Sequence, residues 1–189
     1  LDGRTKCGDY GKPYDYNWEE IRYCAYNTLV DNISIYTVDE IFSNIPKLEN
    51  YYFSFDTKLD PEHFYDEAYR GQYLRAIQRV CEKHDISNNV FIEGDLGLLV
   101  KAKSMGMQTK GIVVGSNVDA AVENGIFGIG FTVDATNEEI DYAHEKGIYV
   151  MVGGAKSDLG NKKGIRLNPD ILVTDKPIPA LMLFERFNF

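Results

Sequence analysis

Six short apolar runs alternate with stretches of helical periodicity from residue 51 to the end of the chain. The runs cover residues 51–57, 89–93, 111–115, 126–133, 147–152 and 170–174. Some of them, such as Gly-Ile-Val-Val-Gly and Ile-Leu-Val-Thr, are apolar on both faces, which is typical of parallel strands covered by helices. The pattern therefore predicts an α/β fold with a parallel sheet. Up to residue 50 the composition predicts irregular loop followed by short helices.

Local signals mark where the helices between these strands begin and end. Two hydroxyl and carboxylate pairs have the spacing of a capping box, namely Thr37 with Glu40 and Thr136 with Glu139. Asp60-Pro61 predicts a further helix start, because proline at the first helical position lacks only an N–H that has no partner there. Left-handed helix terminators are predicted at three glycines, Gly106, Gly125 and Gly147.

Two architectures fit strands that alternate with helices in this way, a closed (β/α)8 barrel and an open doubly wound sheet. Both place their functional residues at the carboxyl ends of the strands. The open sheet usually carries a glycine-rich phosphate-binding loop between its first strand and helix. The glycines of residues 125–130 lie inside a strand-like run instead, which disfavours a phosphate loop at that position.

The strand within residues 51–58 has one aromatic face and one polar face. Because side chains alternate along a strand, Ser54, Asp56 and Lys58 share the polar face. In a barrel this face would point into the lumen at its carboxyl-terminal mouth. We expect the Asp56 carboxylate to hold a divalent metal and the Lys58 ammonium to neutralise an anion. The simpler alternative is that Asp56 caps the next helix and Lys58 is solvated.

Two further positions at strand ends are candidate substrate contacts. Glu93 ends a predicted strand and could contact a ligand or a second metal, whereas Asp95 fits the N-cap of the following helix better. Lys156 follows a pair of glycines at the end of another predicted strand. Its ammonium could attract a phosphate, and the alternative is a mobile, solvated lysine.

The composition excludes some classes of function. A length of 189 residues with 44% hydrophobic and 26% charged residues predicts one soluble globular domain. The formal net charge of -9 and the lack of a basic patch argue against a nucleic acid partner. No apolar run approaches the ~20 residues that cross a bilayer. Cys7, Cys24 and Cys81 are odd in number and far apart, which favours buried or free thiols over a disulfide framework or a zinc site.

Five segments spread over nearly the whole chain carry a family likeness. They are Leu-Asp-Gly-Arg-Thr at 1–5, Tyr-Thr-Val-Asp-Glu-Ile-Phe at 36–42, Phe-Ser-Phe-Asp-Thr-Lys at 53–58, Gly-Ile-Tyr-Val-Met-Val at 147–152 and Ile-Leu-Val-Thr-Asp-Lys-Pro at 171–177. In this order they resemble the glycerophosphodiester phosphodiesterase family. That family has a Leu-Asp-Arg-Thr-Thr segment, a Pro-Thr-Leu-Glu-Glu helix, a strand ending in Glu-x-Lys and a last strand reading Ile-Ile-Thr-Asp-x-Pro.

The resemblance implies a TIM barrel, (β/α)8, that hydrolyses small phosphodiesters such as glycerophosphocholine to glycerol phosphate and an alcohol. A bound divalent cation, calcium or magnesium, is implied as the cofactor. Asp56 takes the place of the family's metal-binding Glu, one methylene shorter, and Lys58 takes the place of its phosphate-facing Lys. Two histidines serve the family as base and acid.

The sequence departs from the family where most of these catalytic groups belong. The His-Arg-Gly and Glu-x-Asp motifs would lie before Leu1, and His63, His84 and His144 lie at helical positions that favour surface or packing roles. We therefore expect residues 1–189 to be a single barrel domain, about the C-terminal three quarters of the fold. About the first one and a half to two β/α units, roughly 50 residues, would be missing. Such a chain is expected to be inactive alone.

Other interpretations of the sequence stay open. The shorter Asp56 and the small residues of 151–156, where the family has Trp-Thr-Val-Asn, also fit a degenerate barrel that binds a phosphorylated or sugar ligand without catalysis. A lyase that makes a cyclic phosphate would differ only in its product. The oligomeric state is open, and so is the compartment. A signal peptide removed before Leu1 would place the protein in the periplasm or outside the cell, and otherwise it would be cytoplasmic.

Overall fold

A six-stranded parallel sheet forms the centre of the computed structural model, which describes residues 16–22, 25–27, 32–59, 61–115 and 117–187. The strands are β3 Phe53–Asp56, β4 Val90–Gly94, β5 Lys110–Val114, β6 Gly128–Thr132, β7 Tyr149–Ala155 and β8 Ile171–Thr174. They are hydrogen-bonded in the order β3-β4-β5-β6-β7-β8, each parallel to the next. The predicted strands and the α/β fold class are confirmed, with small changes at the strand ends.

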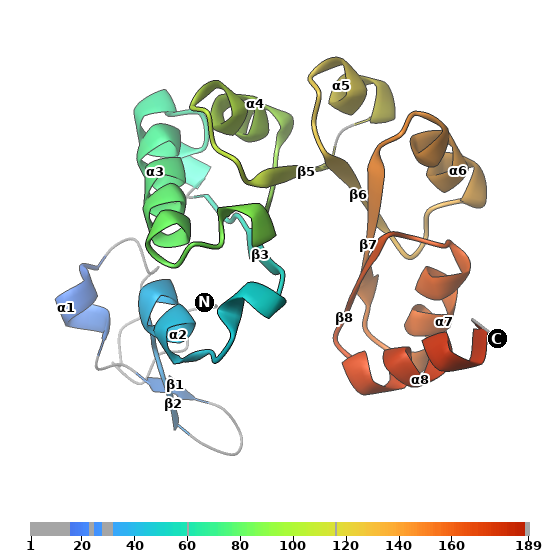
Figure 1. The fold of residues 1–189 in the computed structure, drawn as a ribbon, viewed down its shortest axis with the longest axis horizontal. Helices are drawn as coiled ribbons and strands as arrows, with labels where there is room; N and C mark the ends of the chain where they lie inside the picture. The colour runs from blue at the N-terminus through green and yellow to red at the C-terminus, as the bar shows by residue number, and fades with distance from the viewer. Residues whose placement is uncertain (1–15, 23–24, 28–31, 60, 116, 188–189) are drawn as a thin grey trace.

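Each strand is followed by a helix. The helices are α3 Glu67–Lys83, α4 Leu96–Ser104, α5 Val118–Glu123, α6 Asn137–Glu145, α7 Asp158–Arg166 and α8 Pro177–Phe187, with short 3-10 turns η3 Pro61–His63 and η4 Ser87–Asn89. Figure 1 shows the strands as a curved wall with these helices on its outer side, so that the sheet is a half-barrel. None of the helices in the described part of the chain is both long and apolar enough to cross a membrane.

The hydrophobic core lies between the outer face of the sheet and these helices. One continuous buried cluster contains Val90 and Ile92 of β4 and Val150 of β7. It also contains Leu74 of α3 and Leu98 of α4. Each such side chain contributes about 1.5–3 kcal/mol when it leaves water. The opposite, inner face of the sheet has no helix layer among the described residues, and that leaves its side chains available for a site.

The helix signals are largely confirmed. Both capping boxes are present, at the start of α2 Val38–Asn44 and at the start of α6. Gly106, Gly125 and Gly147 follow α4, α5 and α6 with φ of 74°, 61° and 73°, a backbone conformation that glycine adopts without a Cβ clash.

The predicted helix start at Asp60-Pro61 is only partly correct. Pro61 begins the 3-10 turn η3, and the long helix α3 begins at Glu67. The reason is the N-cap Asp66, whose carboxylate accepts hydrogen bonds from the backbone N–H groups of Ala68 and Tyr69. Asp60 lies outside the described residues.

The region before β3 contains more regular structure than the sequence predicts. It holds α1 Trp18–Ile21, strands β1 Ala25–Asn27 and β2 Asn32–Ser34, α2, and the 3-10 turn η2 Leu48–Asn50. The sequence does not predict the antiparallel pair β1–β2, because strands of three residues are too short to show an alternating pattern. Cys81 is a buried free thiol, as expected, and burial raises its pKa to about 11. Cys7 and Cys24 lie outside the described residues.

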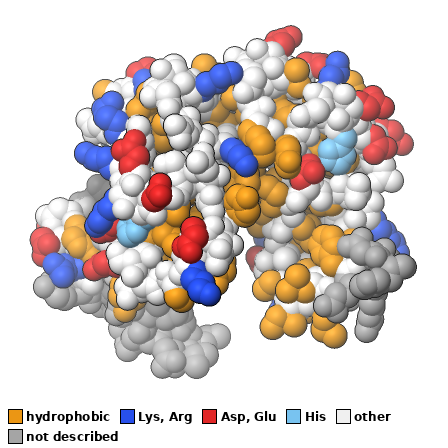
Figure 2. All heavy atoms as spheres, viewed as in Figure 1, with side chains coloured by type: hydrophobic (Ala, Val, Ile, Leu, Met, Phe, Trp, Pro, Cys, Tyr) orange, Lys and Arg blue, Asp and Glu red, His pale blue; other side chains and the backbone are white. Residues whose placement is uncertain are grey.

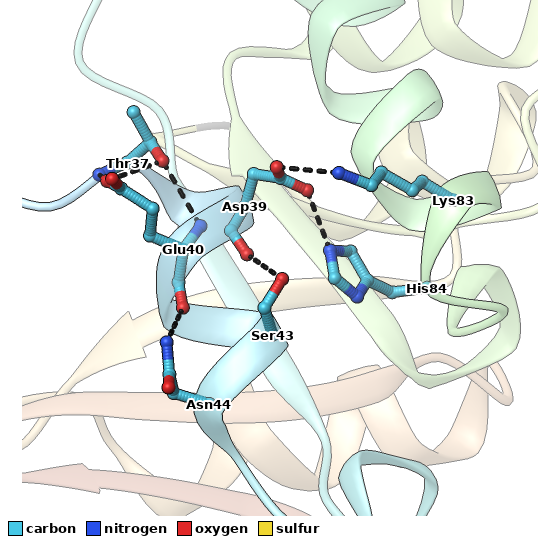
Figure 3. A network of polar contacts seen from close by, with 7 residues as sticks. All are labelled: Thr37, Asp39, Glu40, Ser43, Asn44, Lys83 and His84. Carbon is cyan, nitrogen blue, oxygen red and sulfur yellow. Dashed lines mark hydrogen bonds and ion pairs between the residues drawn. The ribbon is translucent and has the colours of Figure 1, made fainter.

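Helix α2 is fixed to the end of α3 by ionic and aromatic contacts (Figure 3). The Asp39 carboxylate accepts a hydrogen bond from Lys83 Nζ at 2.7 Å and lies 2.9 Å from His84 Nε2. The buried Phe42 ring packs on Phe53 with 4.8 Å between centroids and on the His84 ring with 5.7 Å. The hydrogen bond from Lys83, and then that from His84, hold the pKa of Asp39 below its ordinary value of 3.8.

This contact predicts a pH dependence of stability. Because the folded-state pKa of Asp39 is lowered, its contribution is complete above pH 3.8 and is lost as the pH falls through the folded-state pKa. We expect Asp39→Asn to lower the free energy of unfolding at pH 7, and the difference from the wild type to shrink well below pH 3.8. Urea titrations followed by circular dichroism at both pH values measure this. Lys83→Met should reproduce part of the effect, and a difference that is constant with pH would contradict the prediction.

Candidate functional site

The carboxyl ends of β3 and β4 carry the predicted polar residues on the inner face of the sheet. Along β3 the side chains alternate, with Phe53 and Phe55 packed against the core and Ser54 and Asp56 exposed on the other side. Asp56 is in register with Glu93 of β4, so both carboxylates project from the same face of the sheet. The predicted division of this strand into an aromatic and a polar face is confirmed.

Lys58 and Asp56 form an ion pair with each other. Lys58 Nζ lies 2.5 Å from Asp56 Oδ1, and the two side chains are 80% and 60% exposed. Strand spacing alone places the two groups far enough apart to contact different atoms of one ligand. Their side chains turn toward each other instead and form this ion pair. The pair is open to solvent, so its charges remain accessible to a ligand.

Glu93 is tied to β3 by hydrogen bonds from two hydroxyl groups. Ser54 Oγ donates to Glu93 Oε1, and Thr57 Oγ1 donates to the Glu93 carbonyl oxygen at 2.5 Å. The next residue, Gly94, has no room for a side chain, because a Cβ there would lie 2.9 Å from Thr57 Oγ1. These contacts fix Asp56 and Glu93 as neighbours at one edge of the sheet.

A buried arginine that sequence reasoning missed holds the two loops beside this edge. Arg70 of α3 is 5% exposed, donates from Nε to the Phe64 carbonyl at 2.5 Å and pairs with Asp95 Oδ2 at 3.0 Å. Asp95 is also the N-cap of α4, as predicted, since its carboxylate accepts from the Leu98 N–H. No local sequence signal could reveal this pair, because its members are 25 residues apart.

Lys156, the other predicted substrate contact, is not brought to this group. It follows β7, three strands further along the sheet than β4, and it is exposed. Among the residues that the structure describes, no hydrogen bond or ion pair joins Lys156 to Asp56, Lys58 or Glu93. The structure therefore brings together three of the four candidate residues.

The histidines have packing and ion-pair roles, as expected. His84 pairs with Asp39, and His144 lies 3.2 Å from Asp170 Oδ2, beside the start of β8. Both therefore lie at the amino edge of the sheet, away from Asp56. His63 lies in η3, on the loop that leaves the carboxyl end of β3, and its ring packs on Tyr69. His63 and His84 belong to separate elements, because His63 lies in η3 and His84 is the C-cap of α3.

The donor groups at the carboxyl edge can be compared with what each metal needs. Within the described residues no group of three or more His, Cys, Asp and Glu side chains could hold a metal ion. Calcium takes about six to eight oxygen ligands, whereas magnesium keeps several waters and uses one or two carboxylates. The adjacent carboxylates of Asp56 and Glu93 thus fit a partly hydrated magnesium ion better than a calcium cage.

The amino end of the inner face carries an aromatic cluster around one lysine. Lys110 Nζ lies 4.9 Å from the ring centroid of Phe127, 5.6 Å from that of Phe91 and 5.8 Å from that of Tyr52. The Tyr149 ring stacks on Phe127 at 4.4 Å. Figure 2 shows hydrophobic side chains gathered near the middle of the view, with a notch in the outline between the parts that carry α2 and α8. Cation–π contacts of this kind stabilise the amino end of the sheet.

A parallel sheet curled into a half-barrel, with its helices outside and its polar residues at the carboxyl edge, defines an α/β fold of the TIM-barrel type. No protein-family model and no curated protein sequence matches the chain. Solved structures do match it, and among them are proteins named as glycerophosphodiester phosphodiesterases.

The likeness to these structures extends over nearly the whole chain. A protein from Silicibacter pomeroyi, provisionally named glycerophosphoryl diester phosphodiesterase, has a TM-score of 0.89 and 15% identity over 100% of this chain and 77% of its own. A second of that provisional name, from Agrobacterium tumefaciens, has a TM-score of 0.81 and 15% identity over 100% and 78%. A glycerophosphodiester phosphodiesterase from Parabacteroides distasonis has a TM-score of 0.74 and 10% identity over 92% and 72%. At such identities the likeness concerns the fold.

Proposed function

We propose that this chain is the larger part of a barrel that hydrolyses glycerophosphodiesters to glycerol phosphate and an alcohol. The observation that supports this most directly is the group of Asp56, Lys58 and Glu93 at the carboxyl edge of the sheet. In a TIM-barrel fold this edge is where catalytic residues lie. The names of the structurally similar proteins point to the same reaction.

The proposed roles follow from the chemistry of each group. Hydrolysis of a phosphodiester concentrates negative charge on the phosphoryl oxygens, and the Lys58 ammonium offsets that charge. Asp56 and Glu93 would hold a divalent cation, which when bound polarises the phosphoryl group. Ser54 and Thr57 keep Glu93 in place through their hydrogen bonds. Lys156 is exposed at the rim and stays a candidate contact for the far end of the substrate.

We further propose that about one and a half to two β/α units preceding Leu1 close the barrel between β8 and β3. In the described structure each of these two edge strands pairs on one side only. Tyr52 beside β3 is 67% exposed and Val173 in β8 is 46% exposed, as expected for inner positions that a further strand would cover. The similar proteins have chain to supply such strands, because the match covers 77% of the first and 72% of another.

An assay with glycerophosphocholine and magnesium or calcium tests this function. Residues 1–189 alone are expected to give no turnover, because the histidines that the family resemblance implies as base and acid would lie before Leu1. His84 and His144 pair with aspartates at the amino edge of the sheet, and the Asp56 carboxylate beside Lys58 is assigned to the metal. The protein extended upstream by its own β/α units is expected to release choline and glycerol phosphate. Turnover by residues 1–189 that Asp56→Ala abolishes would refute the first expectation, and an inactive extended protein would refute the second.

A second candidate is a barrel that binds a phosphorylated or sugar ligand without hydrolysing it. The ion pair between Asp56 and Lys58 favours this candidate, because each charge is already neutralised by its partner in the protein without substrate. The same assay separates the two functions. A binding protein retains glycerol phosphate and releases no alcohol, whereas a cyclising lyase would release alcohol and leave a cyclic phosphate.

A further inference from the structure

The ion pair between Lys58 and Asp56 joins the proposed phosphate-binding group to the proposed metal-binding group. Lys58 Nζ contacts Asp56 Oδ1 at 2.5 Å, and no other ion pair engages either side chain in the described part of the chain. Among the described residues no hydrogen bond or ion pair joins Glu93 to the Lys58 ammonium, and Glu93 Oε1 accepts the Ser54 hydroxyl instead. The same carboxylate is therefore required by two cations, the lysine and a divalent ion.

The two partners of Asp56 differ in how strongly they bind a carboxylate. A divalent ion held by Asp56 would carry twice the charge of an ammonium, so its stronger Coulomb attraction would favour it over the ammonium at the same oxygen once enough of the ion is present. Lys58 is 80% exposed and its flexible side chain can turn toward the open inner face once it is released.

We propose that Asp56 withholds Lys58 from phosphate until a divalent cation occupies the Asp56 carboxylate. This inference rests on the proposed function, because it takes Lys58 as the phosphate-binding residue of that site. It adds an order of binding, with the cation first and the phosphodiester second. The inference also gives Asp56 a second function besides binding the metal. Asp56 makes Lys58 available to phosphate only in the metal-loaded protein.

The size of the effect follows from the exposure of the pair. Solvent-exposed ion pairs shift an equilibrium by about two- to fivefold. Freeing Lys58 should therefore strengthen phosphate binding by about that factor, well below what a buried pair would give. The effect is local, so it should depend on Lys58 and not only on the loss of a negative charge.

A double-mutant cycle without metal tests the inference on residues 1–189. Inorganic phosphate is titrated into the wild type, Asp56→Asn, Lys58→Met and the double variant, and the NMR shifts of the backbone amides of residues 56–58 are followed. We expect Asp56→Asn to tighten phosphate binding about two- to fivefold when Lys58 is present and to leave it unchanged when Lys58 is methionine. An equal gain in both backgrounds, no gain, or no phosphate binding by any variant would overturn the proposal.

A matched control comes from a second exposed pair in the same protein. Lys163 Nζ lies 3.2 Å from Asp134 Oδ1, with side chains 52% and 77% exposed. Asp134→Asn should leave phosphate binding at residues 56–58 unchanged. A gain there equal to that of Asp56→Asn would refute the local mechanism.

Magnesium alone gives an independent test that needs neither phosphate nor turnover. In the wild type it should move the side-chain Cε resonance of Lys58 toward its position in Asp56→Asn and leave that of Lys163 in place. A Lys58 resonance that does not respond to magnesium would overturn the proposal. Failure of the proposed function would be a different result. In that case the extended protein would release no alcohol, although phosphate binding changes across the double-mutant cycle as expected.

Discussion

Replacing Lys58 by alanine in the extended protein is expected to reduce kcat for glycerophosphocholine hydrolysis about 100- to 1,000-fold, because loss of one group that stabilises transition-state charge typically has this effect. The ammonium lies 2.5 Å from the Asp56 carboxylate. Because the Lys58 side chain is 80% exposed, the free energy of unfolding should change little. Choline release measured over a range of substrate concentrations separates kcat from KM.

Lys163→Ala is the matched control for this substitution. It also removes an exposed lysine that pairs with an aspartate, but on α7 and away from β3. It should keep the wild-type rate. A Lys58→Ala protein with wild-type kcat would remove Lys58 from the site, and a large loss in the control would point to a general effect of net charge.

Replacing Arg70 by methionine is expected to lower the free energy of unfolding by about 2–3 kcal/mol. Methionine fills much of the same volume but leaves the Phe64 carbonyl without its donor and the Asp95 carboxylate without its cation. Unsatisfied buried groups cost about 1–3 kcal/mol each, and the loss stays below that of a fully buried pair because Asp95 is 32% exposed. Urea unfolding followed by circular dichroism measures the change.

Lys101→Met provides the comparison for Arg70→Met, since Lys101 and Glu67 form another ion pair between α3 and α4. Their side chains are 23% and 70% exposed, so this substitution should cost at most about 1 kcal/mol. Equal losses in the two variants would show that burial of the guanidinium is not what matters. A loss for Arg70→Met below that of the control would contradict the structural role given to Arg70.

The sequence predicts those features that depend on neighbouring residues. Parallel strands covered by helices need continuous apolar runs, and for this reason the sequence alone predicts the six strands β3 to β8. The capping boxes at Thr37 and Thr136 are contained within four residues, and they form as predicted. Strand alternation alone predicts on which face of the sheet the Asp56 side chain lies. Glu93 lies beside Asp56 because the carboxyl ends of parallel strands meet at one edge.

Contacts between distant segments could not be predicted in this way. Arg70 finds Asp95, and Asp39 finds His84, only because helices and loops pack in three dimensions. The pairing of Lys58 with Asp56 is a third case, because strand spacing fixes the backbone positions but not the direction in which a long side chain turns. Lys156 could not be placed relative to Asp56 either. Its position at a strand end is visible in the sequence, but the distance of that strand from β3 is not.

The order of the strands in the sheet has a consequence for how the protein is made. Because β3 to β8 pair in the same order as they occur in the sequence, each strand joins a neighbour that has already left the ribosome. Contacts of this kind have short sequence separation, and such contacts favour rapid folding. Synthesis can therefore add one β/α unit at a time to a growing wall, and each new helix covers apolar surface soon after it appears.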